Sequence, residues 1–325
     1  MKAALALFLW MLLVAPAICS AQDLELRSRA VGLLEKAEAL SLTPNPPNVE
    51  RVDTFRVFDA SAAAREGSFS RVVIQGVGRR EETTFGAYHV INVWRGSVLV
   101  TTRPNALAPP EVATVMHVTP INLPRFDQSD VIRAITDKSV GGRAVHCIEF
   151  DTIVGQSREA NELCVDGSNG TLVSEKLGQD VIENSDFFPF AGSLVPGKIT
   201  YAIFGSAPKL EITQTMTVLE EAAANVLEAP PDATTLHLCT TFRRAIGQSV
   251  PQPKEGRGGR DYDVVIRGII GTDGKIQGAV VQSSPREDLN AEALSLIAQW
   301  VFSPSLCNGR PNQTEASFVL HFQGR

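Results

Sequence analysis

The pattern of apolar and polar residues is most regular near the end of the chain, over residues 261–325. Tyr262–Ile270 alternates apolar with polar residues, which predicts a strand with one buried face. Thr272–Lys275 follows, and its Asp-Gly pair tolerates the positive φ that a tight hairpin requires. A second strand is therefore predicted to return over Ile276–Gln282.

A helix and a third strand are predicted to complete this segment. Asp288 is placed to cap the helix. The apolar stripe of the helix comprises Leu289, Ala293, Leu296, Ile297 and Trp300. Phe302-Ser303-Pro304 ends the helix, because a proline forbids its continuation. The final strand is predicted over Glu315–Phe322.

This order of strand, Asp-Gly hairpin, strand, helix and strand resembles the C-terminal domain of the TonB energy-transducer family. The matching pieces are Thr272–Ile276, the helix end Ala298–Pro304 and the closing strand. The resemblance implies a small β-β-α-β domain over residues 246–325 that adds an extended segment of an outer-membrane receptor, or of another envelope protein, to its sheet. The implied pairing edge is the last strand, with the partner-binding residues Ser317, Phe318, Val319, Leu320, His321 and Phe322.

The chain departs from the family in the parts that transduce energy. A transducer of this kind needs a membrane helix that engages a proton-driven motor and a long proline-rich spacer. The 15 residues of Ala224–Leu238 span at most about 50 Å when fully extended. We therefore expect adhesion without energy transduction, and an inner-membrane-anchored transducer variant for outer-membrane transport is the alternative.

The preceding part of the chain has the pattern of a β-rich domain. Asp23–Leu42 is predicted to be an amphipathic helix, and Asp130–Ile135 a short one. Period-two alternation predicts strands at Ser68–Val77, Arg79–Phe85, Tyr88–Trp94, Ser97–Thr102, Arg143–Asp151, Asn161–Val165, Thr171–Lys176, Thr200–Phe204 and Leu210–Val218.

The leading helix and the strand–turn–strand of Glu162–Asp166 and Gly170–Val173 resemble the half-barrel of LolA-like periplasmic lipoprotein carriers. The resemblance implies an antiparallel half-barrel with an apolar cavity for lipid or lipoprotein acyl chains. The residues implied to line it are Phe69, Val73, Phe85, Val90, Trp94, Ile148, Leu172 and Phe204. The alternatives are an unrelated β-rich domain and a closed core filled by these side chains.

Length and charge fit this organisation. The 325 residues predict an α+β chain with a β-rich domain over 22–223, a linker over 224–245 and the C-terminal domain. The net charge is −6, and residues 22–238 carry 19 basic against 28 acidic side chains. This acidic body argues against nucleic acid as a partner.

The N-terminus has the pattern of a secretory signal peptide over residues 1–21. Lys2 precedes an uncharged apolar run, Ala3–Ile18, and Ala21 is a small residue suited to cleavage. The run of 16 residues is shorter than the roughly 20 that a membrane span needs. The signal predicts a periplasmic protein, with an uncleaved inner-membrane anchor as the alternative.

Four cysteines follow the signal, and an even number in an exported chain predicts disulfides. Cys147 and Cys164 each share a strand face with acidic residues, which suits a bridge between neighbouring strands on the outside of a sheet. Cys239–Cys307 then follows by elimination. No Cys-x-x-Cys pair supports a metal site.

Chemistry-bearing motifs are missing from the sequence. None of the five histidines belongs to a His-Glu-x-x-His pair, and no nucleophile elbow or phosphate-binding loop occurs. The sequence therefore predicts a protein with no catalytic residue, metal or cofactor.

Overall fold

The computed structural model describes residues 21–41, 48–58, 64–102, 107–119, 123–154, 157–220, 225–253 and 262–323. Contacts group the chain into two compact units. Unit 1 comprises Met1–Leu42 with Asn122–Glu183, and unit 2 comprises Thr43–Ile121 with Asn184–Arg325. The predicted signal peptide lies outside the described residues, apart from Ala21. The described residues are rich in strand and poor in helix, as predicted.

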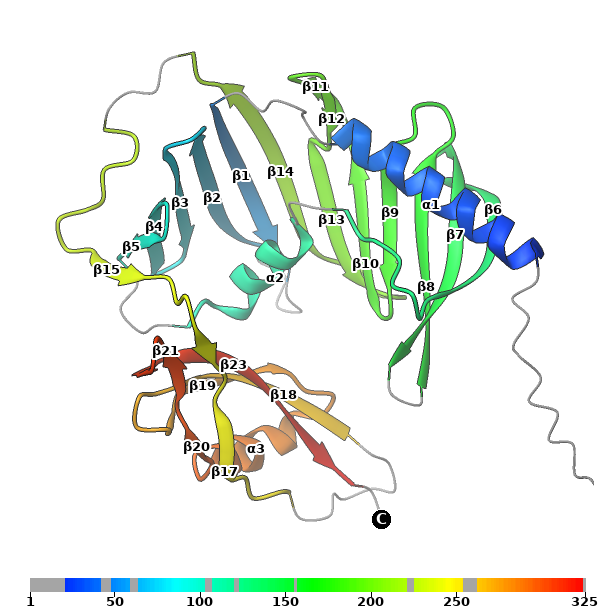
Figure 1. Cartoon of the computed structure of the whole chain (residues 1–325). Coiled ribbons are helices and arrows are strands. Elements are labelled where there is room, and N and C mark those ends of the chain that lie inside the picture. The colour runs from blue at the N-terminus through cyan, green and yellow to red at the C-terminus, as the bar shows by residue number, and fades with distance from the viewer. Residues whose placement is uncertain are drawn as a thin grey trace, which may run out of the picture. The chain divides into compact units, whose positions relative to one another are not determined.

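Unit 1 is one long helix on one face of an antiparallel sheet (Figure 1). Helix α1 spans Ala21–Ser41. The strands follow in sequence as β6 (Val131–Val140), β7 (Arg143–Val154), β8 (Ser157–Asp166), β9 (Leu172–Leu177) and β10 (Asp180–Ser185). The predicted helix at Asp130–Ile135 is wrong, because these residues enter β6 and pair with β7.

Helix α1 packs on the sheet through small and apolar residues on one of its faces. Ala30 and Ala37 let the helix approach the sheet closely, and Leu34 lies between them. With their partners on the sheet they form the α1 cluster, which comprises Ala30, Leu34, Ala37, Ile148, Phe150, Leu163, Val165 and Leu172. The helix is therefore anchored by burial of one face, as an amphipathic helix requires.

Unit 2 contributes eight antiparallel strands, in the spatial order β15-β5-β4-β3-β2-β1-β14-β13. Its strands are β1 (Val49–Val57), β2 (Arg65–Ile74), β3 (Gly78–Phe85), β4 (Tyr88–Arg95), β5 (Val98–Thr101), β13 (Lys198–Ile203), β14 (Pro208–Val218) and β15 (Thr234–His237). Helix α2 (Pro110–Val118) and the hairpin of β11 (Phe188–Phe190) with β12 (Ser193–Val195) accompany it. Strand β1, which lies between β2 and β14, was not predicted from the sequence.

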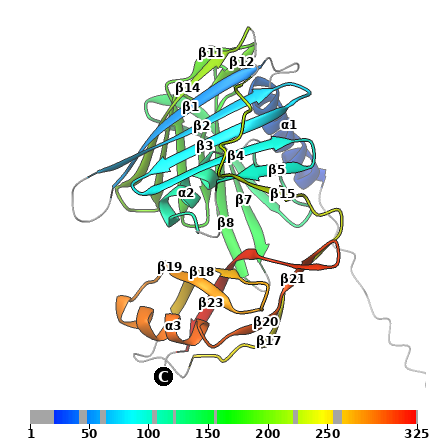
Figure 2. The same ribbon diagram turned by 90° about the vertical axis from the view of Figure 1, so that its left-hand side faces the viewer.

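The predicted linker is partly built into this sheet. β15 pairs with β5 over four residues, and Figure 2 shows the two strands side by side. Leu227 is buried among Val72, Ile74, Ile91 and Val93. The guanidinium of Arg95 donates to the Leu227 carbonyl at 2.7 Å. The segment thus has fixed contacts on the sheet.

The C-terminal module, Phe242–Phe322, begins with β16 (Phe242–Arg243) and β17 (Ile246–Ser249). Its main elements are β18 (Tyr262–Ile270), β19 (Ile276–Ser283), a 3₁₀ turn at Glu287–Leu289, α3 (Asn290–Ile297) and β23 (Thr314–Phe322). Three short strands that the sequence did not predict lie between α3 and β23: β20 (Val301–Ser303), β21 (Ser305–Cys307) and β22 (Arg310–Asn312).

The helix of this module is shorter than predicted at both ends. It stops at Ile297, and Val301–Ser303 instead pairs with β17, so Pro304 follows a strand. Asp288 does not cap it. Asp288 lies in the 3₁₀ turn, where its carboxylate accepts from the guanidinium of Arg286.

The core of the module lies between α3 and one face of the three-stranded sheet. It comprises Val264, Ile266, Ile270, Leu289, Ala293, Ile297, Trp300, Phe318, Leu320 and Phe322. The Trp300 and Phe318 rings meet edge to face at 5.6 Å, a favoured aromatic geometry. Trp300 Nε1 also donates to the Pro251 carbonyl at 2.9 Å, which ties the entering segment to the core.

The structure contains two disulfides, Cys147–Cys164 and Cys239–Cys307. Cys147 and Cys164 lie directly opposite each other on β7 and β8. Both are buried, although their face is polar. Lys138 bonds Glu149 and Glu162, the acidic neighbours of the two cysteines, and a carboxylate oxygen of Glu162 lies within 4.8 Å of both sulfurs.

The hairpin turn gives the first prediction. Gly274 has φ +78°, and a Cβ there would lie 1.8 Å from the Phe302 carbonyl oxygen, whereas Gly278 has φ +58° with open space around it. We expect Gly278→Ala to lower the free energy of unfolding by about 1 kcal/mol. In Gly274→Ala the new Cβ also collides with the Phe302 carbonyl oxygen, so the free energy of unfolding should fall by about 3 kcal/mol or more. Equal losses in chemical denaturation would contradict the role assigned to this turn.

The second prediction concerns the disulfide that closes a loop of 68 residues. Replacing Cys239 and Cys307 with serine frees the unfolded chain and should lower stability by about 4 kcal/mol in the chain-entropy model. Hydrogen exchange of the β18 amides measures this loss. Unchanged exchange relative to the oxidised parent would show that the disulfide does not stabilise the module.

Candidate functional site

The predicted partner-binding strand is an edge strand. The sheet has the order β19-β18-β23, and β23 pairs with β18 over nine consecutive residue pairs, from Tyr262↔Phe322 to Ile270↔Thr314. Within this sheet β23 therefore has a strand neighbour on one side. An edge strand presents backbone amide and carbonyl groups to a further strand.

The two faces of β23 differ in role. Phe318, Leu320 and Phe322 are buried in the core, so three of the six predicted partner-binding side chains hold the strand in place. Ser317, Val319 and His321 alternate with them on the exposed face, and Val319 is 56% exposed. The predicted residues thus divide into anchoring and outward-facing sets.

Polar contacts between side chains on the outer face further fix the strand to its neighbour. His321 Nδ1 and Asp263 Oδ1 lie 2.7 Å apart across the β18–β23 pair. A guanidinium nitrogen of Arg267 lies 3.3 Å from the Glu315 carboxylate. These contacts lie on either side of Val319, so its outward side chain lies between two pairs of polar side chains.

The opposite edge, β19, is less suited to pairing. Its register with β18 shifts twice, between Val265 and Ile266 and between Arg267 and Ile269. Gly278 within it has positive φ. Bulges of this kind twist an edge strand away from regular pairing. The regular edge is therefore β23.

The predicted ligand-lining residues fall into both units. Ile148 and Leu172 belong to the α1 cluster of unit 1. Phe69, Val73, Phe85, Val90 and Trp94 lie on β2, β3 and β4 of unit 2. Phe204 follows the end of β13 and is 58% exposed. The two groups are on separate compact units.

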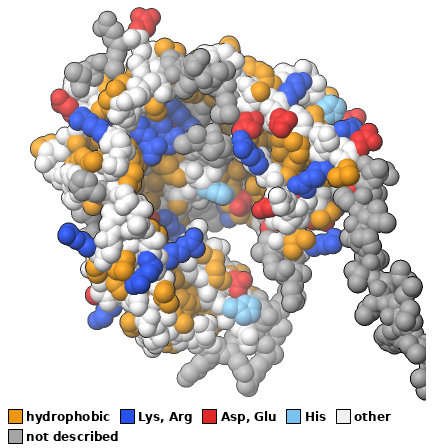
Figure 3. Space-filling view, viewed as in Figure 1, with side chains coloured by type: hydrophobic (Ala, Val, Ile, Leu, Met, Phe, Trp, Pro, Cys, Tyr) orange, Lys and Arg blue, Asp and Glu red, His pale blue; other side chains and the backbone are white. Residues whose placement is uncertain are grey.

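Arginines stack on the aromatic rings of the unit 2 group. The guanidinium carbons of Arg71, Arg65 and Arg79 lie 5.2, 5.1 and 4.1 Å from the ring centroids of Phe69, Phe85 and Trp94, respectively. Figure 3 shows Lys and Arg side chains gathered over β1 and β2. This face is more polar than the apolar wall that the LolA-like resemblance implies.

Paired charges continue on the same face. Arg51 donates to both carboxylate oxygens of the fully buried Asp53, at 2.9 and 3.0 Å from Nε. Burial raises the pKa of Asp53, and the hydrogen bond from Arg51 opposes that rise. Arg71 bonds Glu81 at 2.8 Å. β1 was not predicted from the sequence, so the contribution of its residues Arg51 and Asp53 to this network was not predicted either.

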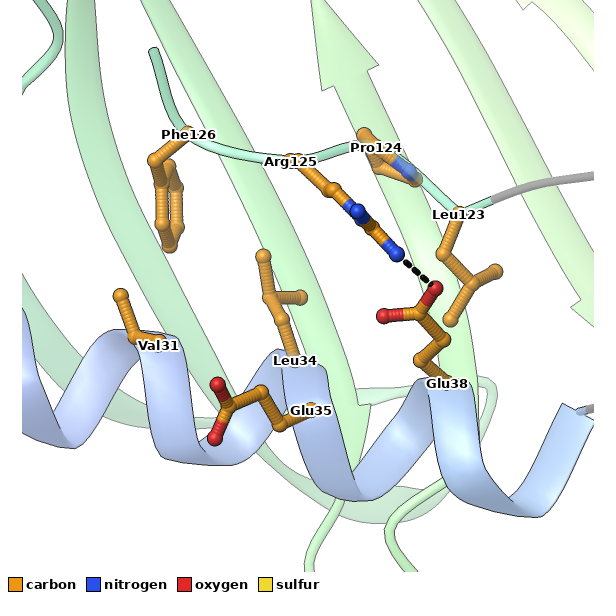
Figure 4. A pocket seen from close by; sticks show the side chains of 8 residues that line it. All are labelled: Val31, Leu34, Glu35, Glu38, Leu123, Pro124, Arg125 and Phe126. Atoms are coloured by element: carbon orange, nitrogen blue, oxygen red, sulfur yellow. Dashed lines mark hydrogen bonds and ion pairs between the residues drawn. The ribbon is translucent and has the colours of Figure 1, made fainter. Parts of the chain in front are cut away.

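A cavity of about 310 Å³ lies in unit 1 between α1 and the segment that precedes β6. Its lining comprises Val31, Leu34, Glu35, Glu38, Leu123, Pro124, Arg125 and Phe126. In Figure 4, Leu34 and Leu123 point into the space between helix and segment, and Arg125 reaches Glu38 at its rim. The volume is at the lower end of the range for small-molecule sites.

Glu175 on β9 is the most unusual carboxyl group of unit 1. It is only 6% exposed, and its register partners, Leu163 on β8 and Ile182 on β10, are both buried and apolar. No described residue forms a hydrogen bond or ion pair with its carboxyl group. Burial in this apolar setting raises the pKa of Glu175 to about 7.

No residue set in the described chain forms a metal site with available ligands. Cys147, Glu162 and Cys164 lie within 4.8 Å of one another, but both sulfurs are joined in a disulfide. The sequence analysis did not identify Glu175 or the α1 cavity. A glutamate on a strand is ordinarily solvent-exposed, and only the pairing of β8, β9 and β10 reveals its burial.

Comparison with known proteins supports the TonB-like resemblance of the C-terminal segment. Residues 254–323 match the family model of the Gram-negative bacterial TonB protein C-terminal domain. No curated protein matches the chain. No helix among the described residues has the length and apolar character of a membrane span.

Solved structures similar to the chain share little sequence with it. A putative outer membrane lipoprotein-sorting protein domain from Vibrio parahaemolyticus is 10% identical, with 60% of this chain and 94% of that one covered and a TM-score of 0.39. A LolA superfamily protein from Nitrosomonas europaea is 14% identical, with coverage of 61% and 96% and a TM-score of 0.37. A DUF1329 family protein from Desulfovibrio piger is 9% identical, with coverage of 62% and 96% and a TM-score of 0.41.

The pKa of Glu175 gives the third prediction. Its folded pKa of about 7 exceeds the ordinary value of 4.5, so the folded state holds this proton more tightly than the unfolded state. Stability should fall by roughly 3 kcal/mol as the pH rises from 4.5 to 7, and then level off. Glu175→Gln stays neutral at every pH, so this pH-dependent loss of stability should be absent from the variant.

Chemical denaturation between pH 5 and pH 8 measures the effect as the difference between the parent and Glu175→Gln. Glu183→Gln on the neighbouring strand β10 is the matched control, because Glu183 is exposed. A difference that stays constant across this pH range would contradict the burial of an unpartnered carboxyl group.

Proposed function

We propose that this protein is a periplasmic envelope protein that docks a partner protein by adding an extended segment of the partner to β23. The observation that carries the proposal is the regularity of this edge. β23 keeps an uninterrupted register with β18 through nine residue pairs, while the register of β19 shifts twice. The match of residues 254–323 to the TonB C-terminal family model supports the same edge.

The packing of β23 makes it a rigid template. Its inner face is held by Phe318, Leu320 and Phe322, so the strand is already ordered before a partner binds. Strand addition then orders only the incoming segment, and backbone hydrogen bonds supply the affinity. The outward side chains of Ser317, Val319 and His321 select among partner sequences.

The partner class follows from the family match. We propose an extended periplasmic segment of an outer-membrane receptor or of another envelope protein. The proposed docking surface thus lies in the C-terminal module, and the β-rich part has a separate binding role.

That second role is the binding of lipid or a lipoprotein acyl group. The observation that favours it is the cavity between α1 and Leu123–Phe126, which has an apolar interior and a charged rim. The rim pair Arg125–Glu38 is exposed to solvent on the arginine side, so an entering apolar chain need not displace a buried charge.

The fourth prediction tests docking on β23. A photo-cross-linking amino acid replaces Val319 in the full chain expressed in its own cell, and a matched variant carries it at Val280 on the bulged edge. Both positions are exposed apolar residues of edge strands, at 56% and 38%. We expect an outer-membrane or envelope protein to be captured several-fold more efficiently from position 319.

The captured segment is then made as a peptide and added to the purified chain. Strand addition should protect the β23 amides from hydrogen exchange and leave the β19 amides unchanged. Equal capture at both positions, or protection confined to β19, would overturn the assignment of the docking edge.

A further inference from the structure

We propose that an arginine cluster on the unit 2 strands, comprising Arg51, Arg71 and Arg79, binds a phosphate group, either free or as the head group of an amphiphile. The inference goes beyond the two roles proposed above, because it concerns neither β23 nor the cavity of unit 1. It rests on guanidinium groups that the strand register brings together and that keep unused hydrogen-bond donors.

The register of three neighbouring strands places these side chains on one face. Arg51 on β1 is the direct partner of Arg71 on β2. Arg71 is in turn the direct partner of Glu81 on β3. Arg79 lies two positions before Glu81 on the same strand, so its side chain shares that face. Figure 3 shows Lys and Arg side chains gathered over β1 and β2.

Two arginines at directly opposite positions are an unfavourable pair in the absence of an anion. Directly opposite Cβ atoms lie about 4.5–5.5 Å apart, and like charges at that spacing destabilise a sheet. Asp53 offsets part of this repulsion through its bonds with Arg51, and Glu81 lies beside Arg71. Three cations against two carboxyl groups leave one positive charge in excess, which a bound anion would compensate.

The contacts within the cluster leave donor atoms unused. Arg51 bonds Asp53 through Nε and Nη2, and no described residue accepts a hydrogen bond from its Nη1. Arg71 bonds Glu81 through Nε, and no described residue accepts from either of its Nη atoms. Nε of Arg79 is buried without a hydrogen-bond partner and lies 3.6 Å from Oε1 of Glu81. All three guanidinium groups therefore have donors available for a ligand.

Packing holds these donors in place and leaves them within reach of solvent. Arg71 stacks on the ring of Phe69 at 5.2 Å, and Arg79 stacks on Trp94 at 4.1 Å. The side chains of Arg51, Arg71 and Arg79 are 13%, 18% and 42% exposed, respectively. Guanidinium groups that are ordered and partly desolvated lose less entropy on binding an anion than flexible surface cations do.

The geometry of the donors sets the ligand class. A guanidinium presents its N–H groups in a planar fork that matches the oxygens of a phosphate group. One phosphate group offers enough acceptor oxygens to bond two opposed forks at once, and its charge compensates the excess of the cluster. A neutral head group lacks that charge. The rings of Phe69 and Trp94 lie beside the arginines and suit an apolar chain attached to the phosphate.

The test uses the full chain and three probes: inorganic phosphate, a short-chain phosphatidic acid, and the diacylglycerol with the same acyl chains. The two lipids differ only by the phosphate group. Their affinities are measured by calorimetry for the parent and for Arg71→Gln. We expect the parent to prefer phosphatidic acid over diacylglycerol by about ten-fold or more, as loss of charge-assisted hydrogen bonds implies. Arg71→Gln should lose this preference.

Two further variants separate recognition from packing. Arg80→Gln is the matched control, because Arg80 follows Arg79 on β3 and lies on the opposite face, where it bonds Glu82. This variant should keep the parent's preference. Arg71→Gln combined with Glu81→Gln removes both partners of one ion pair, so it leaves no unpaired carboxylate, and it should lose the preference as Arg71→Gln does. Thermal unfolding shows that each variant is folded.

Two results would overturn the proposal. The first is a parent that neither binds inorganic phosphate nor prefers phosphatidic acid over diacylglycerol. The second is a preference that falls equally in Arg71→Gln and Arg80→Gln, since the effect would then belong to net charge and not to this face.

The probes also distinguish the two sources of the phosphate group. Similar affinities for inorganic phosphate and phosphatidic acid would support a site for free phosphate, and tighter binding of phosphatidic acid would support a site for the head group of an amphiphile. Binding of diacylglycerol in the cavity of unit 1 does not involve Arg71. Failure of the arginine cluster would therefore leave the lipid role of unit 1 and the docking role of β23 in place.

Discussion

Burial of one sheet face under one helix is the constraint on which both candidate sites depend. In unit 1 the small residues Ala30 and Ala37 bring α1 close to β7 and β8, and in the C-terminal module Ala293 does the same for α3. Each helix covers one face of its sheet only. In the module, this fixes the inner side of β23 and leaves its backbone edge and outer side chains for recognition. In unit 1, the same covering encloses the α1 cluster and forms one wall of the cavity.

The two sites use opposite physical means. At β23 the proposed recognition surface is backbone, so the affinity would depend on a regular, pre-ordered strand and would tolerate many partner sequences. At the α1 face the proposed surface is a partly apolar cavity, so the affinity would depend on shape.

The sequence pattern predicted the elements that are defined by residues close together in the sequence. The Asp273-Gly274 turn and the alternation of β18 and β23 were visible in the sequence because a hairpin and a half-buried strand each leave a short-range signature. Asp130–Ile135 was misassigned because six residues are too few to separate the helical from the strand period. The end of α3 was misplaced because pairing with β17, a tertiary contact, takes Val301–Ser303 into a strand.

Site residues were harder to predict than elements. The outward residues of β23 could be named from alternation, but whether β23 or β19 is the regular edge depends on bulges that only the paired strands show. The arginines stacked on Phe69, Phe85 and Trp94 and the burial of Glu175 depend on which strands become neighbours. These neighbours include β1 and β10, which the sequence pattern did not reveal.

The disulfide between Cys239 and Cys307 also has a mechanical meaning. Thr314, where β23 begins, lies seven positions after Cys307, and β15 ends two positions before Cys239. β23 is held to β18 by nine residue pairs and to the core by Phe318, Leu320 and Phe322, so tension on β23 is shared by the folded module. The cross-link adds a short covalent path from the start of β23 to the end of β15 that does not run through the 68-residue loop containing β18 and α3. The disulfide would therefore keep β23 attached to β15 even after that loop had been pulled open.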